Sequence, residues 1–252
     1  MSENRWIRSG PWRAPGSSEG PLLPSLEGVY ATKPEIVAAV IPPPLEAPPD
    51  PRVHVRITNI DIDLPDGTKH QEKVGYFAVD ALYEGTVGEY PLLIPIDLDS
   101  AVSISRERFG EPKKLAEIHL GRDGDHVEGA MARQGVTFAE MVGDITGILP
   151  VPEPYPATQF WFKFLPAVDG IGFDAGPILV RVDQIRSPKT LETVEGKLVL
   201  RDLATAPVAD LPVDDLISLT WTTRRSSHQP VVVGPVDADA FAPFAAARYD
   251  HV

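Results

Sequence analysis

The sequence predicts a mainly β (α+β) fold, an antiparallel β-barrel or sandwich with a few short peripheral helices. Three observations predict it. Apolar and polar residues alternate with a period of two in many short segments, turn residues separate these segments, and 27 prolines in 252 residues disfavour long helices. We expect residues 1–27 to form an extended N-terminal arm and residues 28–252 to form a single domain.

The first helix is expected early in the chain, before the strands begin. Thr32 and Glu35 have the spacing of a capping box, and Pro34 suits the first turn. These signals predict a short helix over residues 34–41, which the prolines at 42–44 end. Val53 and Val55 then begin a period-two pattern. We expect strands from residue 52 onward and over residues 74–82, 90–96 and 101–105.

The second half of the chain repeats the alternation of strands and turns. The turn at residues 121–124 predicts a hairpin, and four alternating prolines at 150–156 predict an extended, unpaired segment. Asp237 is expected to cap a last short helix, and a further short helix is expected over residues 214–219. The predicted strands here are residues 115–120, 126–132, 158–165, 178–185 and 191–203.

The composition supports a sizeable core and excludes several classes of function. Hydrophobic residues make up 43% of the chain, and 23 basic against 36 acidic residues give a formal net charge of −13. An acidic chain suits neither nucleic acid nor an anionic membrane, so we expect neither as a partner. Without cysteine there is no disulfide, thiolate catalysis or Cys-ligated zinc. No apolar run reaches transmembrane length, and residues 1–8 lack a signal-peptide core, so we expect a cytoplasmic protein.

The segment at residues 103–117 carries the most informative chemistry. It holds the only adjacent lysine pair in the sequence, Lys113 and Lys114, directly after Pro112. A neutral lysine can form a Schiff base with a ketone, but lowering a lysine pKa by roughly four units costs about 5 kcal/mol. A second ammonium about 5 Å away supplies only about 3 kcal/mol at an effective dielectric of ~20. We therefore expect an apolar, water-poor site around Lys113, in addition to the charge of Lys114.

Several motifs resemble those of the acetoacetate decarboxylase family. The signature is Arg106-Glu107, four further residues and then Pro112-Lys113-Lys114. Four other stretches resemble the family in the same order along the chain: residues 29–46, 88–90, 162–170 and 206–213. The resemblance implies a closed antiparallel β-barrel or cone. It also implies that Lys113 forms the imine and that Lys114 depresses its pKa, the activation that this family exemplifies.

Three further residues are candidates for binding the substrate. The family pattern implies that Arg106 and Glu107 line the cavity near Lys113, Arg106 as an anchor for a carboxylate and Glu107 as a polar or proton-handling group. The family also uses a glutamate about 39 positions before the imine-forming lysine, where this chain has Val74. Glu72 could take that role after a local shift of the alignment.

The sequence departs from the family around the carboxylate of the substrate. The family has an arginine before the early helix, but no arginine lies between Arg13 and Arg52 here. A second acidic position of the family, on the early strand, is Arg56 in this chain. Relatives that keep the lysine but change these surroundings act as aldolase-dehydratases on pyruvate and aldehydes.

Other reaction classes have little support. The glycines at 170, 172 and 176 precede a predicted strand, where a dinucleotide fingerprint needs a helix. The six histidines show no metal-binding spacing, and no Gly-x-Ser-x-Gly motif is present. We expect neither a metal nor a cofactor.

Three hypotheses follow for the function. The first is a Schiff-base lyase that decarboxylates a small 3-oxo acid such as acetoacetate through a Lys113 imine. The second uses the same imine in a pyruvate-dependent aldolase-dehydratase, and the third is a barrel that binds a small acid without catalysis. For the two enzymatic hypotheses the partner is a small keto-acid substrate, and the acidic composition and family precedent favour a homo-oligomer.

Overall fold

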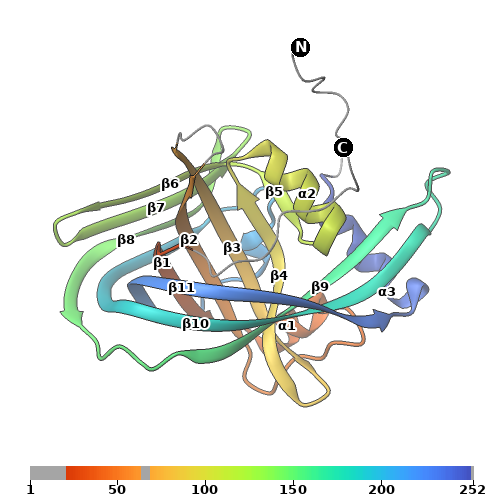
Figure 1. Cartoon of the computed structure of the whole chain (residues 1–252), viewed down its shortest axis with the longest axis horizontal. Coiled ribbons are helices and arrows are strands. Elements are labelled where there is room, and N and C mark those ends of the chain that lie inside the picture. The colour runs from red at the N-terminus through yellow and green to blue at the C-terminus, as the bar shows by residue number, and fades with distance from the viewer. Residues whose placement is uncertain (1–20, 64–68, 251–252) are drawn as a thin grey trace, which may run out of the picture.

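The computed structural model describes residues 21–63 and 69–250. Most described residues belong to strands, as the alternating sequence predicts (Figure 1). The strands are β1 (Leu23–Ala31), β2 (Arg52–Asp63), β3 (Lys69–Tyr83), β4 (Thr86–Ile96), β5 (Lys113–Leu115), β6 (Glu117–Asp123), β7 (His126–Arg133), β8 (Val136–Ile148), β9 (Tyr155–Pro166), β10 (Phe173–Leu200) and β11 (Asp215–Pro235). The helices are α1 (Pro34–Val40), α2 (Asp99–Phe109) and α3 (Ala238–Ala245), with the 3-10 turns η1 (Val208–Asp210) and η2 (Ala246–Arg248).

Seven strands pair into a closed ring. The order is β1-β2-β3-β4-β9-β10-β11, and β11 returns to pair with β1. All neighbours in the ring are antiparallel except β4 and β9, which meet in parallel at Glu89 and Gln159. The short strand β5 adds to β4, also in parallel. The prediction of a mainly β, closed cone-like fold is therefore confirmed.

Three further strands extend the sheet and pack on the outside of this ring. The long strand β10 leaves β9 and continues through a pairing with β8, so β8, β7 and β6 extend the same sheet (Figure 1). Leu26 and Ile57 of the ring and Met131 of β7 are fully buried. Gly129 allows the close approach, because a Cβ there would lie 2.9 Å from the Ile57 side chain. This contact forms one half of the main hydrophobic core.

The helices α1 and α3 and the turn η1 cover the outer surface of β3, β4 and β9. Val37 of α1, Val208 of η1 and Phe241 of α3 are buried in the same core as Phe77 and Phe162. Asp237 caps α3 as predicted, since its side chain accepts hydrogen bonds from the backbone amides of residues 239 and 240. The outer face of the ring is thus apolar and covered, and its inner face is left for polar groups.

Four sequence expectations are wrong. Thr32 does not cap α1: the N-cap is Lys33, no side chain caps this end, and Thr32 Oγ1 has no hydrogen-bond partner among the described residues. Residues 101–105 lie in α2 and not in a strand; their two apolar side chains alternate, but Gly110 at φ 85° ends a helix that buries Ser105. Residues 215–219 begin strand β11 and do not form a helix, because they pair with β1. The arm predicted over residues 1–27 ends earlier, since β1 begins at Leu23, and residues 1–20 lie outside the described ranges.

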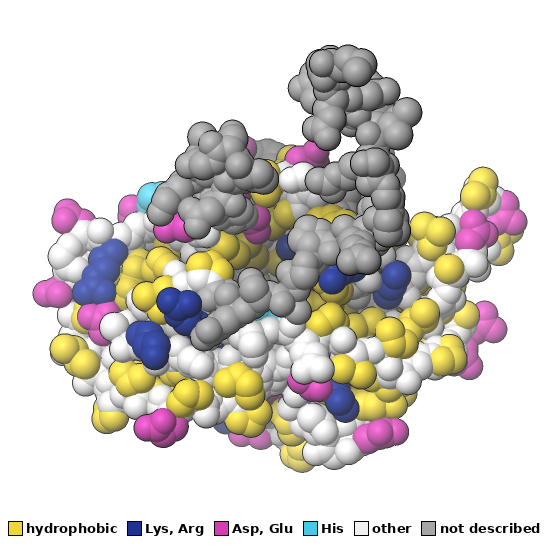
Figure 2. Space-filling model, viewed as in Figure 1, with side chains coloured by type: hydrophobic (Ala, Val, Ile, Leu, Met, Phe, Trp, Pro, Cys, Tyr) yellow, Lys and Arg dark blue, Asp and Glu magenta, His cyan; other side chains and the backbone are white. Residues whose placement is uncertain are grey.

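Figure 2 shows how the charged side chains are distributed on one face of the molecule. In the face shown in Figure 2, the acidic groups lie mainly around the periphery. No helix within residues 21–63 and 69–250 is both long and apolar enough to cross a membrane.

Candidate active site

Polar side chains from all seven strands of the ring meet inside it. Each strand contributes one member, and six of the seven residues are buried. This polar cluster consists of Glu27, Arg56, Tyr76, Glu89, Gln159, Arg186 and Arg224. Because strands that are not hydrogen-bonded neighbours supply partners to one another, as β4 and β10 do, the cluster marks the inner face.

Ion pairs hold the polar cluster together. Arg186 binds the Glu89 carboxylate through two hydrogen bonds, at 2.7 and 3.0 Å. Arg56 Nε lies 3.0 Å from Glu27 Oε1, and Arg56 Nη2 lies 3.7 Å from Glu89 Oε1. Arg224 also pairs with Glu27. Bidentate pairs of this kind are strong and fix orientation as well as charge.

The arginines keep both carboxylates ionised. Burial opposes the ionisation of Glu89, but Arg186 and Arg56 outweigh it and hold the pKa of Glu89 well below its usual range. Burial likewise acts against ionised Glu27, yet Arg224 and Arg56 lower its pKa to about 2. Neither carboxylate can therefore donate a proton near neutral pH.

The cluster has more positive than negative charge. Three arginines face two glutamates, which leaves one formal positive charge. Burial, together with the nearby Arg56 and Arg186, lowers the pKa of Arg224 in spite of its pairing with Glu27. Arg224 Nε is buried and has no hydrogen-bond partner among the described residues. This surplus cation suits the binding of a carboxylate.

Lys113 faces the same inner side of the sheet. Parallel pairing places it beside Ile94, and Ile94 packs against Tyr76 of the polar cluster. His228 links the two regions electrostatically. Burial lowers the pKa of His228 to about 4, and the positive charge of Arg186 adds to this effect. Other cations, including Lys113, contribute less. Lys113 therefore lies on the same face of the sheet as the polar cluster.

Two side chains contact the Lys113 amine directly. Lys113 Nζ donates a hydrogen bond to Ser105 Oγ at 3.0 Å and lies 3.1 Å from Glu111 Oε2. The side chains of Lys113 and Glu111 are each 13% exposed, so the amine does not project into bulk solvent. Helix α2 supplies Ser105, which gives the unpredicted helix a position in the site.

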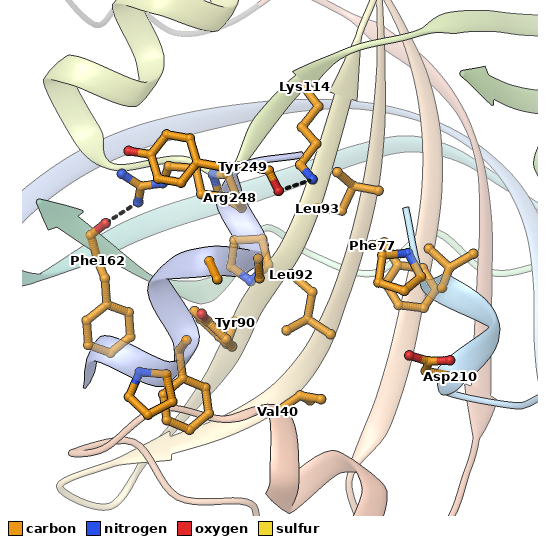
Figure 3. A pocket seen from close by; sticks show the side chains of 18 of the residues that line it. Val40, Phe77, Tyr90, Leu92, Leu93, Lys114, Phe162, Asp210, Arg248 and Tyr249 are labelled. Carbon is orange, nitrogen blue, oxygen red and sulfur yellow. Dashed lines mark hydrogen bonds between the residues drawn. The ribbon is translucent and has the colours of Figure 1, made fainter. Parts of the chain in front are cut away.

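Lys114 points to the opposite face. Side chains alternate along a strand, and Lys114 Nζ donates hydrogen bonds to the backbone oxygens of Thr205 and Tyr249, at 3.1 and 3.3 Å (Figure 3). It also lies 3.1 Å from Asp250 Oδ1. The two lysines share no partner, so the structure does not bring their amines side by side as the sequence suggested. Burial lowers the pKa of Lys114, against the effect of Asp250.

The outer side of β5 borders an apolar cavity. Its volume is about 460 Å³, and α1, α3 and the turns η1 and η2 close it over β4 and β9 (Figure 3). Lys114 and Arg248 are the cations in its lining. Arg248 Nη2 donates hydrogen bonds to the backbone oxygens of Gly110 and Phe162, and the guanidinium lies over the ring of Phe164. This cavity is a different space from the interior of the ring.

The structure separates Arg106 and Glu107 from Lys113. Both line a second cavity of about 570 Å³ between α2 and the strands β9 and β10. Arg106 stacks on the ring of Tyr249, 4.9 Å from its centroid. Successive residues of a helix point in different directions, so Ser105 is the one of the three that reaches Lys113. The expected role of this arginine as a carboxylate anchor thus has no geometric support.

Glu72 and Val74 lie on the inner face with Tyr76. The register of β2 and β3 is continuous here, so residues 72, 74 and 76 share one side of β3. Glu72 is buried, and Val74 packs against the apolar group that includes Ile94. Residue 74, which occupies the position of the family glutamate, therefore lies on the inner face, but it is a valine.

Sequence reasoning missed most of the polar cluster. Glu27 falls in the segment expected to be an arm, and Arg186 and Arg224 lie more than 70 residues beyond Lys113. No alternation marks Arg224, because residues 222–229 are all polar. Within the described residues, no group of three or more His, Asp or Glu side chains is placed to hold a metal ion.

Comparisons with known proteins agree with this geometry. The model of the acetoacetate decarboxylase family matches residues 14–234. An acetoacetate decarboxylase of Burkholderia vietnamiensis strain G4 is 31% identical over 195 residues, which cover 75% of this chain and 76% of that relative. A solved acetoacetate decarboxylase superposes with a TM-score of 0.77 at 22% identity, covering 88% of this chain and 91% of that chain.

A second solved enzyme has the same fold at lower similarity. The enduracididine biosynthesis enzyme MppR, complexed with the condensation product of pyruvate and imidazole 4-carboxaldehyde, superposes with a TM-score of 0.66 at 16% identity. The match covers 85% of this chain and 90% of that chain. At this identity the likeness establishes the fold alone.

Proposed function

Because this chain belongs to the acetoacetate decarboxylase family, a family of lyases, we propose that it decarboxylates a small 3-oxo acid through an imine on Lys113. The observation that carries the proposal is the position of this amine. It lies on the inner face of the ring, largely shielded from water and beside a buried cluster with surplus positive charge. No metal or organic cofactor is needed for this chemistry.

The proposed reaction runs through four covalent steps. Neutral Lys113 attacks the ketone, and loss of water gives a protonated imine. The imine accepts the electron pair of the breaking carbon–carbon bond, so carbon dioxide leaves and an enamine remains. A proton adds to the enamine carbon, and water then releases the product ketone and the lysine. The sum consumes one proton from solvent for each carbon dioxide formed.

We propose that the arginines of the polar cluster take the place of the anchor expected at Arg106. Arg224 and Arg56 are the leading candidates, because the Nε of each has no hydrogen-bond partner among the described residues and Arg186 is already engaged by Glu89. This replacement accounts for the missing family arginine upstream of the early helix. It also reassigns the activation of Lys113 from the neighbouring ammonium to the surroundings of the inner face, because Lys114 faces away.

The direct test is the formation of acetone and carbon dioxide from acetoacetate. We expect turnover in the wild type and none in Lys113→Gln. Lys197→Gln, which removes an exposed lysine of β10, should retain wild-type activity. Equal activity in the wild type and Lys113→Gln would contradict the proposal.

A second candidate function is the use of the same imine in a pyruvate–aldehyde condensation. The surplus arginine charge suits this reaction as well, because pyruvate also carries a carboxylate. A fold relative was solved with a pyruvate–aldehyde condensation product bound. Mixing pyruvate with an aldehyde and following a new conjugated absorbance distinguishes the two reactions.

We also propose that the chain forms a homo-oligomer. The turn between β9 and β10 projects from the body (Figure 1) and exposes Val168 and Ile171 at 97% and 81%. Exposed apolar side chains of this size are common at subunit contacts. Light scattering after size exclusion should give a mass of at least twice 27.4 kDa, and a monomer mass would contradict this part of the proposal.

A further inference from the structure

The carboxylate of Glu111 is the acidic group that the structure places against the Lys113 amine. Glu111 Oε2 lies 3.1 Å from Lys113 Nζ, and both side chains are mostly buried. This oxygen accepts no hydrogen bond from the described residues, so the ion pair with Lys113 is the contact that the structure gives it. A buried carboxylate oxygen without a hydrogen bond calls for an explanation, and the neighbouring Lys113 amine offers one.

The backbone around Glu111 is held on both sides. Gly110 ends α2 in the left-handed region, and its carbonyl oxygen accepts a hydrogen bond of 2.6 Å from Arg248 Nη2. The Pro112 carbonyl oxygen accepts a hydrogen bond from the amide of Ile94, and the Lys113 amide donates one to the Glu111 carbonyl oxygen at 2.8 Å. A catalytic group gains most from a rigid support of this kind.

The other carboxylates on the inner face are poor candidates for moving protons. Glu27 and Glu89 are ionised because arginines lower the pKa of each. Glu107 lines the second cavity with Arg106 and does not face the amine. Glu111 differs from all three, since its partner is the reacting lysine.

We propose that Glu111 is the proton carrier of the Lys113 imine reaction, an inference that rests on the proposed function. Glu111 takes a proton from the Lys113 ammonium, which leaves a neutral amine. It returns that proton to the hydroxyl group that leaves as water when the imine forms. After carbon dioxide departs, a proton from solvent passes through Glu111 to the enamine carbon. The Glu111 carboxylate is restored after imine formation and again after protonation of the enamine, so protons and electrons balance.

The experiment measures exchange of the methyl protons of acetone in D2O by NMR. The imine of acetone loses an α-proton to a base and regains deuterium, so this exchange reports proton transfer at carbon without decarboxylation. General acid–base catalysis contributes typically ~10²–10⁴-fold. We expect Glu111→Gln to slow exchange by about 10²-fold, while borohydride on long incubation with acetone still reduces an adduct onto Lys113.

Two matched variants complete the test. Glu117→Gln makes the same chemical change at an exposed site on β6 and should exchange acetone protons at the wild-type rate. Glu111→Asp keeps a carboxylate and should exchange at least about tenfold faster than Glu111→Gln. Asp and Gln variants that are equally slow would indicate a steric role and overturn the inference.

Failure of the inference and failure of the proposed function give different results. If borohydride traps acetone on wild-type Lys113 but Glu111→Gln exchanges protons at the wild-type rate, the inference is wrong and the lysine chemistry stands. If the wild type is not trapped at all, the proposed function fails, and the role of Glu111 fails with it.

Discussion

Lys113 and Lys114 are adjacent in sequence, yet the two faces of β5 give them opposite surroundings. Lys113 lies beside a carboxylate and a serine and faces a ring interior with three arginines. Lys114 donates to two backbone oxygens and pairs with Asp250 next to an apolar cavity. Only side chains contact the first amine, whereas two backbone oxygens and a carboxylate hold the second. The comparison indicates that the proposed imine chemistry belongs to the inner face of β5, and that the outer face holds the C-terminal segment.

The largest expected difference between the faces is in turnover. Lys113→Gln removes the proposed nucleophile, so decarboxylation of acetoacetate should fall to the uncatalysed rate, a loss of at least ~10⁶-fold. A steady-state assay of acetone formation measures it. The comparison breaks if this variant retains a substantial fraction of wild-type kcat.

The next largest effect concerns the stability of the polar cluster. Arg186→Met leaves Glu89 buried without its bidentate partner, so we expect the free energy of unfolding to fall by about 3–5 kcal/mol. Arg201→Met makes the same change in an exposed pair with Glu140 and should cost no more than about 1 kcal/mol. Urea denaturation of both variants checks the contrast, which equal losses would contradict.

The pH dependence of stability should also report the inner face. The pKa of folded Glu27 is about 2, below its ordinary value of 4.5, so its ionised form stabilises the fold above about pH 4.5. That contribution, about 3 kcal/mol, is lost as pH falls from about 5 towards 2. Unfolding free energies measured across this range should fall less steeply in Glu27→Gln. Identical slopes in variant and wild type would show that Glu27 does not provide this stabilisation.

The smallest expected effect belongs to the outer face. Lys114→Met removes a satisfied amine, while Asp250 keeps two hydrogen bonds to Arg133. We expect a loss of about 1–2 kcal/mol in unfolding free energy. We expect kcat to stay within about threefold of wild type, less than ~1 kcal/mol of activation free energy. A loss of turnover similar to that of Lys113→Gln would restore the idea that one ammonium activates the other.

Local signals in the sequence identified much of the fold. The proline-initiated helix α1 and the Asp237 cap of α3 depend on neighbouring residues, so the sequence predicts both. The helix α2 was missed because two apolar residues with a spacing of two suit a strand as well as one helical turn. Long-range pairing decided the start of β11, which no local pattern reveals.

The candidate site was predictable where its residues are close in sequence. The motif at residues 106–114 identified the lysines, but it could not show which side of the sheet each lysine faces. The polar cluster takes one residue from each of seven strands, spread from Glu27 to Arg224. Closure of the ring brings these residues together, and their spacing in the sequence does not predict that they meet.

Peptide mapping after borohydride reduction tests the central comparison most directly. The wild-type protein is incubated with acetoacetate, reduced with borohydride, digested and analysed by mass spectrometry, which distinguishes residue 113 from residue 114 by fragmentation. The account predicts one reduced adduct on Lys113 and an unmodified Lys114. An adduct on Lys114, or no adduct on either lysine, would contradict it.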